Sequence, residues 1–76
     1  MEELVEYLAK GLVDKPDEVR VERLERDGVV VLELRVAEDD VGKVIGRQGR
    51  VARALRTIVR ASAARSNERA LLEIIG

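Results

Sequence analysis

The sequence predicts an α+β domain in which three helices cover one face of a small, three-stranded mixed sheet. Three observations support this prediction: helical periodicity in two long segments, period-two alternation on both sides of an Asp-Gly pair, and a third apolar strand pattern near the C-terminal end. The predicted element order is α-β-β-α-α-β. Because the chain has 76 residues, residues 1–76 are expected to form a single domain of modest stability.

The first helix is predicted from Glu3 to Val13. Its acidic residues lie in the first turns, where the helix dipole favours negative charge. The segment Asp14-Lys15-Pro16-Asp17 ends the helix, because a residue before proline avoids the helical region. The apolar residues that fall on one helical face are Leu4, Val5, Leu8 and Leu12.

Two antiparallel strands are predicted around Asp27-Gly28, a pair that suits a type I′ hairpin turn. The first strand begins at Val19, and Leu24 breaks its alternation, which predicts a bulge near Arg23. The second strand runs from Val29 to Val36. Valines also occur on its other face, so we expect part of that face to be covered as well.

A short and a long helix are predicted next. The acidic run Glu38-Asp39-Asp40 is expected to cap a short helix that ends at Ile45, and its glycines keep that helix short. The long helix runs from Arg50 to Arg65. The third strand, Glu68 to Ile75, follows a right-handed crossover and is parallel to the second strand if the two are adjacent. The side of the long helix predicted to face the core holds Val51, Leu55, Ile58, Val59 and Ser62.

Charge is unevenly distributed along the chain, although the net charge is only −1. Between Val41 and Arg65 there are seven basic residues and no acidic residue, and the rest of the chain has a balance of −8. Such a basic block favours a polyanionic partner. The alternative is a set of solvated arginines, and for Arg56, Arg60 and Arg65 the two interpretations have equal weight.

The most informative segment is VGKVIGRQGR, in which Gly46 and Gly49 bracket Arg47 and Gln48. Glycine allows a backbone to approach a ligand closely, and N–H groups at a helix start favour anions. With positive charge at the tip, this combination predicts contact with a phosphate backbone. An ordinary turn between two helices is the structural alternative.

Several classes of function are not expected. The chain lacks histidine and cysteine, its hydroxyl residues have no evident base beside them, and its glycines fit neither a Walker A motif nor a dinucleotide fingerprint. We therefore expect neither an enzyme nor a bound metal or cofactor. No apolar run approaches the length of a membrane span, and the absence of cysteine suits a reducing compartment, so a cytoplasmic protein without membrane insertion is expected.

The order of elements and the loop resemble a KH domain of the second topological type, over essentially all 76 residues. The segment VAEDDVGKVIGRQGRVARALRTIVRASAAR is similar to that of small stand-alone bacterial KH proteins of the KhpA family. This resemblance implies single-stranded RNA binding as an RNA chaperone or post-transcriptional regulator. It also implies a homodimer, or a heteromer with a larger KH protein of the Jag/KhpB type.

The resemblance also implies a set of contact residues. Gly46, Arg47, Gln48 and Gly49 would lie against the sugar-phosphate backbone of about four nucleotides. Aliphatic rather than aromatic surface would receive the bases, so each site is expected to be weak. The same KH fold could instead serve as a protein-interaction or dimerisation module with an idle groove, such as a scaffold or a ribosome-associated factor. The remaining implied contact residues beside the loop are Lys43, Arg50 and Arg53. The groove is implied to hold Val41, Val44 and Ile45 on one side, with Val36 and Leu72 or Ile74 opposite. For Val44 and Ile45, a place in the hydrophobic core is the alternative.

Overall fold

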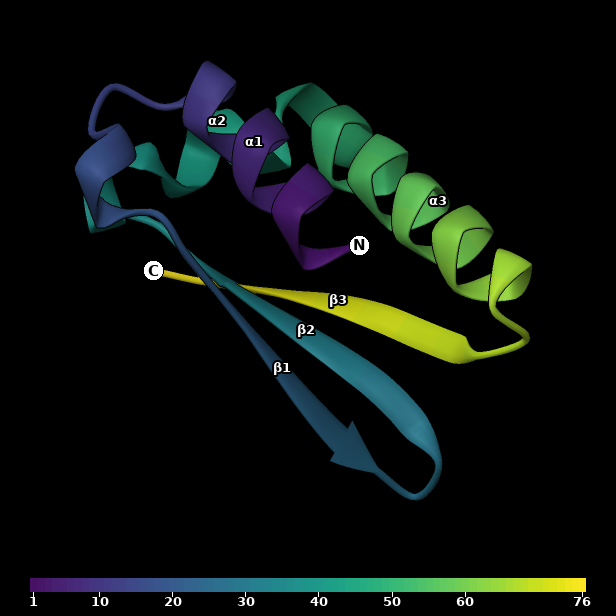
Figure 1. Ribbon diagram of the computed structural model, residues 1–76. Coiled ribbons are helices and arrows are strands. Elements are labelled where there is room, and N and C mark those ends of the chain that lie inside the picture. Colours follow the sequence, from purple (N-terminus) through teal and green to yellow (C-terminus); the bar gives the residue numbers. More distant parts are fainter.

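A computed structural model describes all residues, Met1–Gly76, and confirms the predicted α+β class and element order (Figure 1). Three short 3₁₀ turns supplement the main elements: η1 (Pro16–Glu18), η2 (Glu38–Asp40) and η3 (Arg47–Gly49). The helices and strands are α1 (Glu2–Leu12), β1 (Arg20–Arg26), β2 (Val29–Arg35), α2 (Val41–Ile45), α3 (Arg50–Arg65) and β3 (Arg69–Ile75).

The sheet has the strand order β1-β2-β3, with β1 antiparallel and β3 parallel to the central strand. The hairpin turn is formed as predicted: Asp27 and Gly28 have φ angles of 53° and 78°, and Arg26 pairs with Val29. Positive φ at both central positions gives the turn the twist of the flanking strands. The crossover through α2 and α3 makes β2 and β3 parallel neighbours, as the order of elements predicts.

The predicted bulge near Arg23 is wrong, because β1 pairs with β2 without interruption from Arg20 to Arg26. Leu24 lies opposite Val31, on the face of the sheet that points away from the helices. The alternation of apolar and polar residues in β1 is irregular because the outer face of the sheet also has apolar side chains. The expected cover over the outer valines is confirmed at Val31, which is buried.

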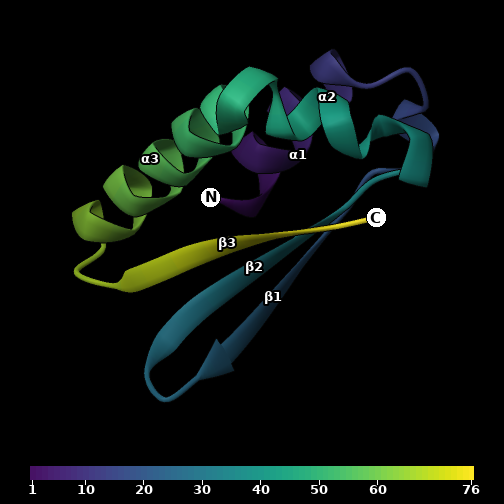
Figure 2. The same ribbon diagram turned by 180° about the vertical axis from the view of Figure 1, so that it is seen from behind.

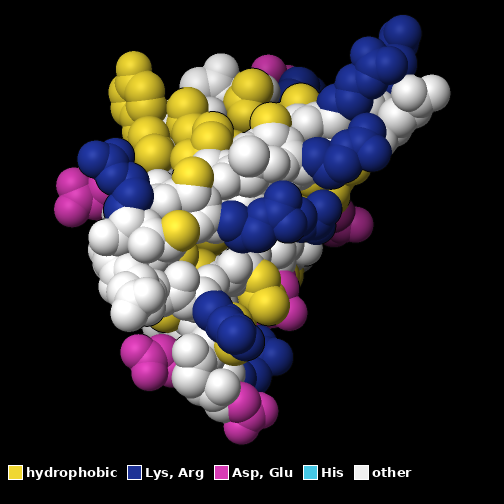
Figure 3. Space-filling model, turned by 90° about the vertical axis from the view of Figure 1, so that its right-hand side faces the viewer, with side chains coloured by type: hydrophobic (Ala, Val, Ile, Leu, Met, Phe, Trp, Pro, Cys, Tyr) yellow, Lys and Arg dark blue, Asp and Glu magenta, His cyan; other side chains and the backbone are white.

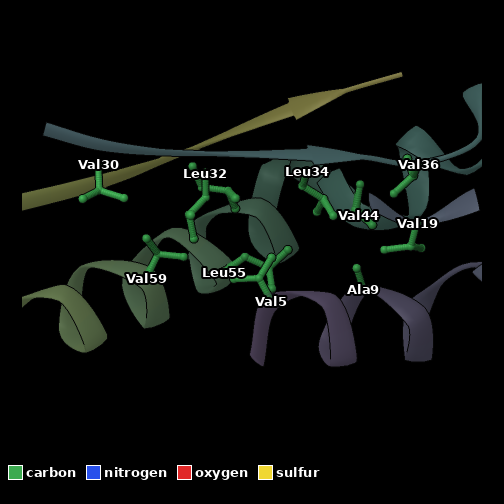
Figure 4. Close-up of a cluster of buried hydrophobic side chains, with 11 residues drawn as sticks. Val5, Ala9, Val19, Val30, Leu32, Leu34, Val36, Val44, Leu55 and Val59 are labelled. Atoms are coloured by element: carbon green, nitrogen blue, oxygen red, sulfur yellow. The ribbon is translucent and has the colours of Figure 1, made fainter. Parts of the chain in front are cut away.

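All three helices lie on one side of the sheet, and the other side is bare (Figures 1 and 2). The core between the layers consists of aliphatic side chains from every helix and strand except β1 (Figure 4). Leu32 and Leu34 of the central strand are completely buried there. The same cluster holds Val5, Ala9, Val19, Val30, Val36, Val44, Leu55, Val59 and Leu72.

The buried side of α3 differs in part from the predicted side. Leu55 and Val59 are buried as expected, but Ala52 and Ala63 are buried too. Alanine has the small side chain that a helix needs where it packs closely against its neighbours. The residues Val51, Ile58 and Ser62 are only half-buried.

Candidate nucleic-acid interface

The loop between α2 and α3 adopts a conformation that few sequences allow. Gly46 has φ 75° and ψ 172°, Gln48 has φ 56°, and Gly49 has φ 73°. The Gly46 N–H donates to the Gly42 carbonyl (2.9 Å), and the Gly49 N–H donates to the Gly46 carbonyl (3.1 Å). These bonds close one helix and begin the next within four residues.

Glycine is required at position 46 for two reasons. Its φ and ψ lie in a region that only glycine populates readily. In addition, a Cβ atom at Gly46 would overlap the side chain of Val51 and press on its backbone nitrogen. At Gly49 there is open space, and only the positive φ favours glycine.

Two backbone donors in this loop have no acceptor within the protein. The N–H groups of Arg47 and Gln48 donate to no backbone or side-chain atom, and both residues are exposed. Free N–H groups beside a helix start and a cationic side chain favour the binding of an anion.

Two arginines of α3 hold the tip of the loop. The Arg53 Nη2 donates to the Gln48 carbonyl (3.1 Å), and the Arg50 Nη2 donates to the Gln48 side-chain oxygen (3.4 Å). Both guanidinium groups therefore lie against Gln48 at the tip of the loop, whereas Arg47 itself is unpaired and exposed. Figure 3 shows Lys and Arg side chains gathered on one side of the molecule, next to a patch of hydrophobic side chains.

The predicted aliphatic residues are divided between surface and core. Val41, Ile45 and Ile74 are half-buried and leave some apolar surface exposed. Val44 is completely buried and anchors α2 in the core, which agrees with its alternative as a core residue and leaves no exposed surface on it in the free protein. The other expected groove residues, Val36 and Leu72, also belong to the core cluster.

Lys43 is engaged by acidic residues rather than free. Its Nζ lies 3.1 Å from a carboxylate oxygen of Asp14 and 3.8 Å from one of Asp40. The hydrogen bond with Asp14 and the attraction of its charge raise the pKa of Lys43 above its ordinary value. Lys43 is positively charged at neutral pH, and an RNA phosphate would have to compete with Asp14 for it.

Asp40 was expected to cap the short helix, but it makes no capping hydrogen bond. Its side chain is buried instead and accepts the N–H groups of Asp14 (3.2 Å) and Lys15 (3.0 Å). The carboxylate thereby fastens the segment after α1 to the start of α2. The sequence contains no signal for this contact, because the partners are about 25 residues apart and the bonds go to backbone atoms.

Changing Asp40 to asparagine is expected to lower the free energy of unfolding by about 1–3 kcal/mol, the usual cost of leaving buried partners unsatisfied. An asparagine side chain has one acceptor oxygen for two N–H donors. Urea denaturation measures the change. The control is Asp39→Asn, since Asp39 is exposed and only pairs with Lys15; a loss of the same size in the control would contradict the role given to Asp40.

No cluster of acidic or histidine residues suitable for a metal ion occurs in the structure. None of the helices combines the length and apolar character needed to span a membrane.

A three-stranded mixed sheet, three helices on one face and a G-x-x-G loop between two of them define a KH domain. The model of a family described as "KhpA/KhpB, KH domain" matches residues 2–74. The chain belongs to this family, as its resemblance predicted.

Curated relatives are similar over nearly their full length. A Treponema pallidum protein is 57% identical over 97% of this chain and 92% of its own. A Clostridium acetobutylicum protein is 51% identical over 99% of this chain and 100% of its own. Both relatives carry the name "RNA-binding protein KhpA".

Among solved structures, Era from Aquifex aeolicus has a matching segment. The TM-score is 0.67 at 21% identity, over 96% of this chain and 28% of the Era chain. At this level of identity the likeness concerns the fold alone.

Proposed function

We propose that this protein binds single-stranded RNA, with the loop from Gly46 to Gly49 against the sugar-phosphate backbone. The observation that supports this most directly is the pair of free N–H groups at Arg47 and Gln48, in an exposed loop that Arg50 and Arg53 contact. The names of its relatives, which describe RNA-binding proteins, support the same class of ligand.

In the proposed complex, phosphate oxygens accept hydrogen bonds from the N–H groups of Arg47 and Gln48. The absence of a side chain at Gly46 and Gly49 lets the RNA backbone come close to the loop. Arg47, Arg50 and Arg53 add charge-assisted contacts, which are stronger than neutral ones. Arg53 already holds the Gln48 carbonyl in the free protein, which restrains the loop before RNA binds.

The bases are proposed to rest on the apolar surface left by Val41, Ile45 and Ile74. This surface offers no aromatic ring for stacking, because the only aromatic residue, Tyr7, projects from α1. Base stacking on aromatic side chains contributes about 1–3 kcal/mol per base in other proteins, so a single site of this kind should bind in the micromolar range or more weakly.

A weak site gains from a second copy or a partner that carries another RNA site, through effective concentration. We therefore place the protein among RNA chaperones or post-transcriptional regulators of the cytoplasm. It would act as a homodimer or with a larger KH protein of the Jag/KhpB type, and no step of this role needs catalysis or a cofactor.

The double change Arg47→Asp and Gln48→Asp is expected to weaken binding of a single-stranded RNA at least tenfold. It removes one cation, adds two anions, and leaves the glycines and the core in place. Fluorescence anisotropy with a short labelled RNA measures the affinity. Unchanged affinity would contradict the proposal and favour the alternative, an interaction module with an idle groove.

A matched control distinguishes a local effect at the loop from an effect of the total charge of the protein. The pair Arg65→Asp and Asn67→Asp makes the same change in net charge at the far end of α3, about 22 Å along the helix axis from the loop. This control should bind nearly as well as the unchanged protein. Equal losses in both variants would mean that the chain attracts RNA only by its overall charge.

Salt gives a second measurement of the same contacts. For single strands, a plot of the logarithm of the binding constant against the logarithm of the salt concentration has a slope of about −0.7 per neutralised phosphate. Three arginine contacts therefore predict a slope of about −2. The loop variant should show a shallower slope than the unchanged protein.

A further inference from the structure

The exposed side of α3 has a stripe of arginines that continues from the loop. At about 100° per residue, Arg53, Arg56 and Arg60 fall within about 60° of one another around the helix axis. All three residues are exposed, and the stripe extends about 10 Å along the axis from Arg53 to Arg60. Figure 3 shows Lys and Arg side chains following one another across one side of the molecule. These three residues are called the arginine stripe below.

The arginine stripe has no acidic partner within the protein. Carboxylates are not scarce, since the chain has 15 acidic and 14 basic residues. None of them lies between Val41 and Arg65 in the sequence, and none folds back onto the stripe. The stripe therefore keeps its charge available for a ligand. The basic residues that do form ion pairs are Lys10, Lys15, Arg23, Arg26, Arg35 and Lys43.

The arrangement of these charges is unfavourable for the free helix. Arg53 and Arg56 are three residues apart and Arg56 and Arg60 are four apart, and like charges at these spacings destabilise a helix. Arg50 and Arg53 also lie in the first turn of α3, which has no acidic residue, although the helix dipole disfavours cations there. Anionic groups placed over the stripe would remove both costs.

The other residues on this side of α3 have short side chains. Thr57 and Ala64 share the side with the stripe, and both are exposed. The Thr57 hydroxyl donates to the Arg53 carbonyl (2.9 Å), so it is bonded to the backbone of its own helix. The arginines are therefore the longest side chains on this side, and no bulky neighbour stands between them and a strand that lies along the helix.

The arginine stripe is continuous with the RNA site proposed at the loop. Arg53 belongs to both, because its Nη2 donates to the Gln48 carbonyl at the tip of the loop. Arg56 follows about one helical turn further along α3, and Arg60 about one turn after that. An RNA backbone held at the loop would therefore meet these two arginines if it continued along the helix.

We propose that the arginine stripe extends the RNA site, with the sugar-phosphate backbone of the same strand running along α3 and its phosphates against Arg56 and Arg60. A G-x-x-G loop holds about four nucleotides, so the favoured ligand is single-stranded RNA that continues beyond this length. Arginine binds phosphate oxygens through two N–H groups at once, which suits a series of phosphates. This proposal rests on the proposed function, and adds to it residues outside the loop and its apolar surface.

The test uses the double variant Arg56→Gln and Arg60→Gln with labelled RNA pools of random sequence, about four and about twelve nucleotides long. The variant should bind the longer RNA at least tenfold more weakly and the shorter RNA nearly as well as the unchanged protein does. On the longer RNA, its salt slope should be shallower by about 1.4, which corresponds to two lost phosphate contacts. The melting temperature should stay the same or rise, because the variant removes repulsion between like charges.

The matched control is the double variant Arg65→Gln and Arg69→Gln. It makes the same change in net charge, and both residues are exposed. Arg65 lies about 120° around the axis of α3 from Arg53, and Arg69 lies in β3. The control should bind both RNA pools nearly as well as the unchanged protein does.

The loop variant Arg47→Asp with Gln48→Asp separates this proposal from the proposed function. It should weaken binding of both RNA pools, and normal binding of both would contradict the proposed function itself. If the loop variant loses both RNAs but the stripe variant loses neither, only the role of the stripe is overturned, and its charge would serve another acidic partner. Equal losses on the two RNA lengths, or equal losses in the stripe variant and its control, would also overturn the proposal.

Discussion

Replacing Gly46 with alanine is expected to lower both the stability of the domain and its affinity for RNA by large amounts. The backbone at Gly46 lies in a region that costs a non-glycine residue about 1–3 kcal/mol, and the new methyl group would also overlap Val51. At about 4–8 °C per kcal/mol for a domain of this size, the melting temperature should fall by about 8 °C or more. The loop must shift to relieve the overlap, which moves the Arg47 and Gln48 N–H groups.

Two neighbouring glycines provide controls, and we expect one alanine substitution to lower the stability of the domain and the other to raise it. Gly49→Ala has open space around the new methyl group and only a left-handed φ to oppose it, so its cost should be about 1 kcal/mol. Gly42→Ala lies inside α2, also in open space, and should stabilise the protein by up to about 1 kcal/mol. Thermal unfolding followed by circular dichroism should give the lowest melting temperature for Gly46→Ala, a higher one for Gly49→Ala and the highest for Gly42→Ala.

Changing Leu32 to alanine is expected to remove about 2–5 kcal/mol of stability, the range found for leucine in well-packed cores. Leu32 lies on the central strand, is completely buried, and points toward the helices (Figure 4). A 76-residue domain has about 4–11 kcal/mol in total, so this single change should remove a large share of the stability. Urea denaturation gives the value.

Leu71→Ala is the matched control for the core substitution. Leu71 pairs with Val31 on the outer face and is exposed, so its loss should cost less than about 1 kcal/mol at low protein concentration. Equal costs for the two leucines would contradict the assignment of inner and outer faces.

The fold could be predicted from local patterns because most elements obey them. Asp27-Gly28 fixes the hairpin, the alternation after Val29 fixes which face of β2 is inside, and the periodicity of α3 identifies Leu55 and Val59. The bulge near Arg23 was wrongly predicted because alternation alone assumes that every apolar residue faces the helices. Leu24 satisfies its apolar character on the outer face instead.

Within the candidate site, the sequence identified the loop and its arginines but not the acidic contacts. Pairing of Lys43 with Asp14 depends on how the segment after α1 is folded back on α2, which no local pattern encodes. The same is true of Asp40, whose hydrogen bonds go to distant backbone atoms. Whether Val44 contacts a ligand or the core also depended on the rotation of a five-residue helix, which is too short for its periodicity to decide.

The acidic partners of Lys43 and Lys15 have a consequence for the chemistry of these amines. Both pKa values are raised, Lys43 by Asp14 and Lys15 by Asp39, so a smaller share of each amine is neutral at any pH below those values. The neutral amine is the nucleophile that attacks acylating reagents. Lys43 should therefore resist non-enzymatic acylation and keep its charge at the edge of the loop.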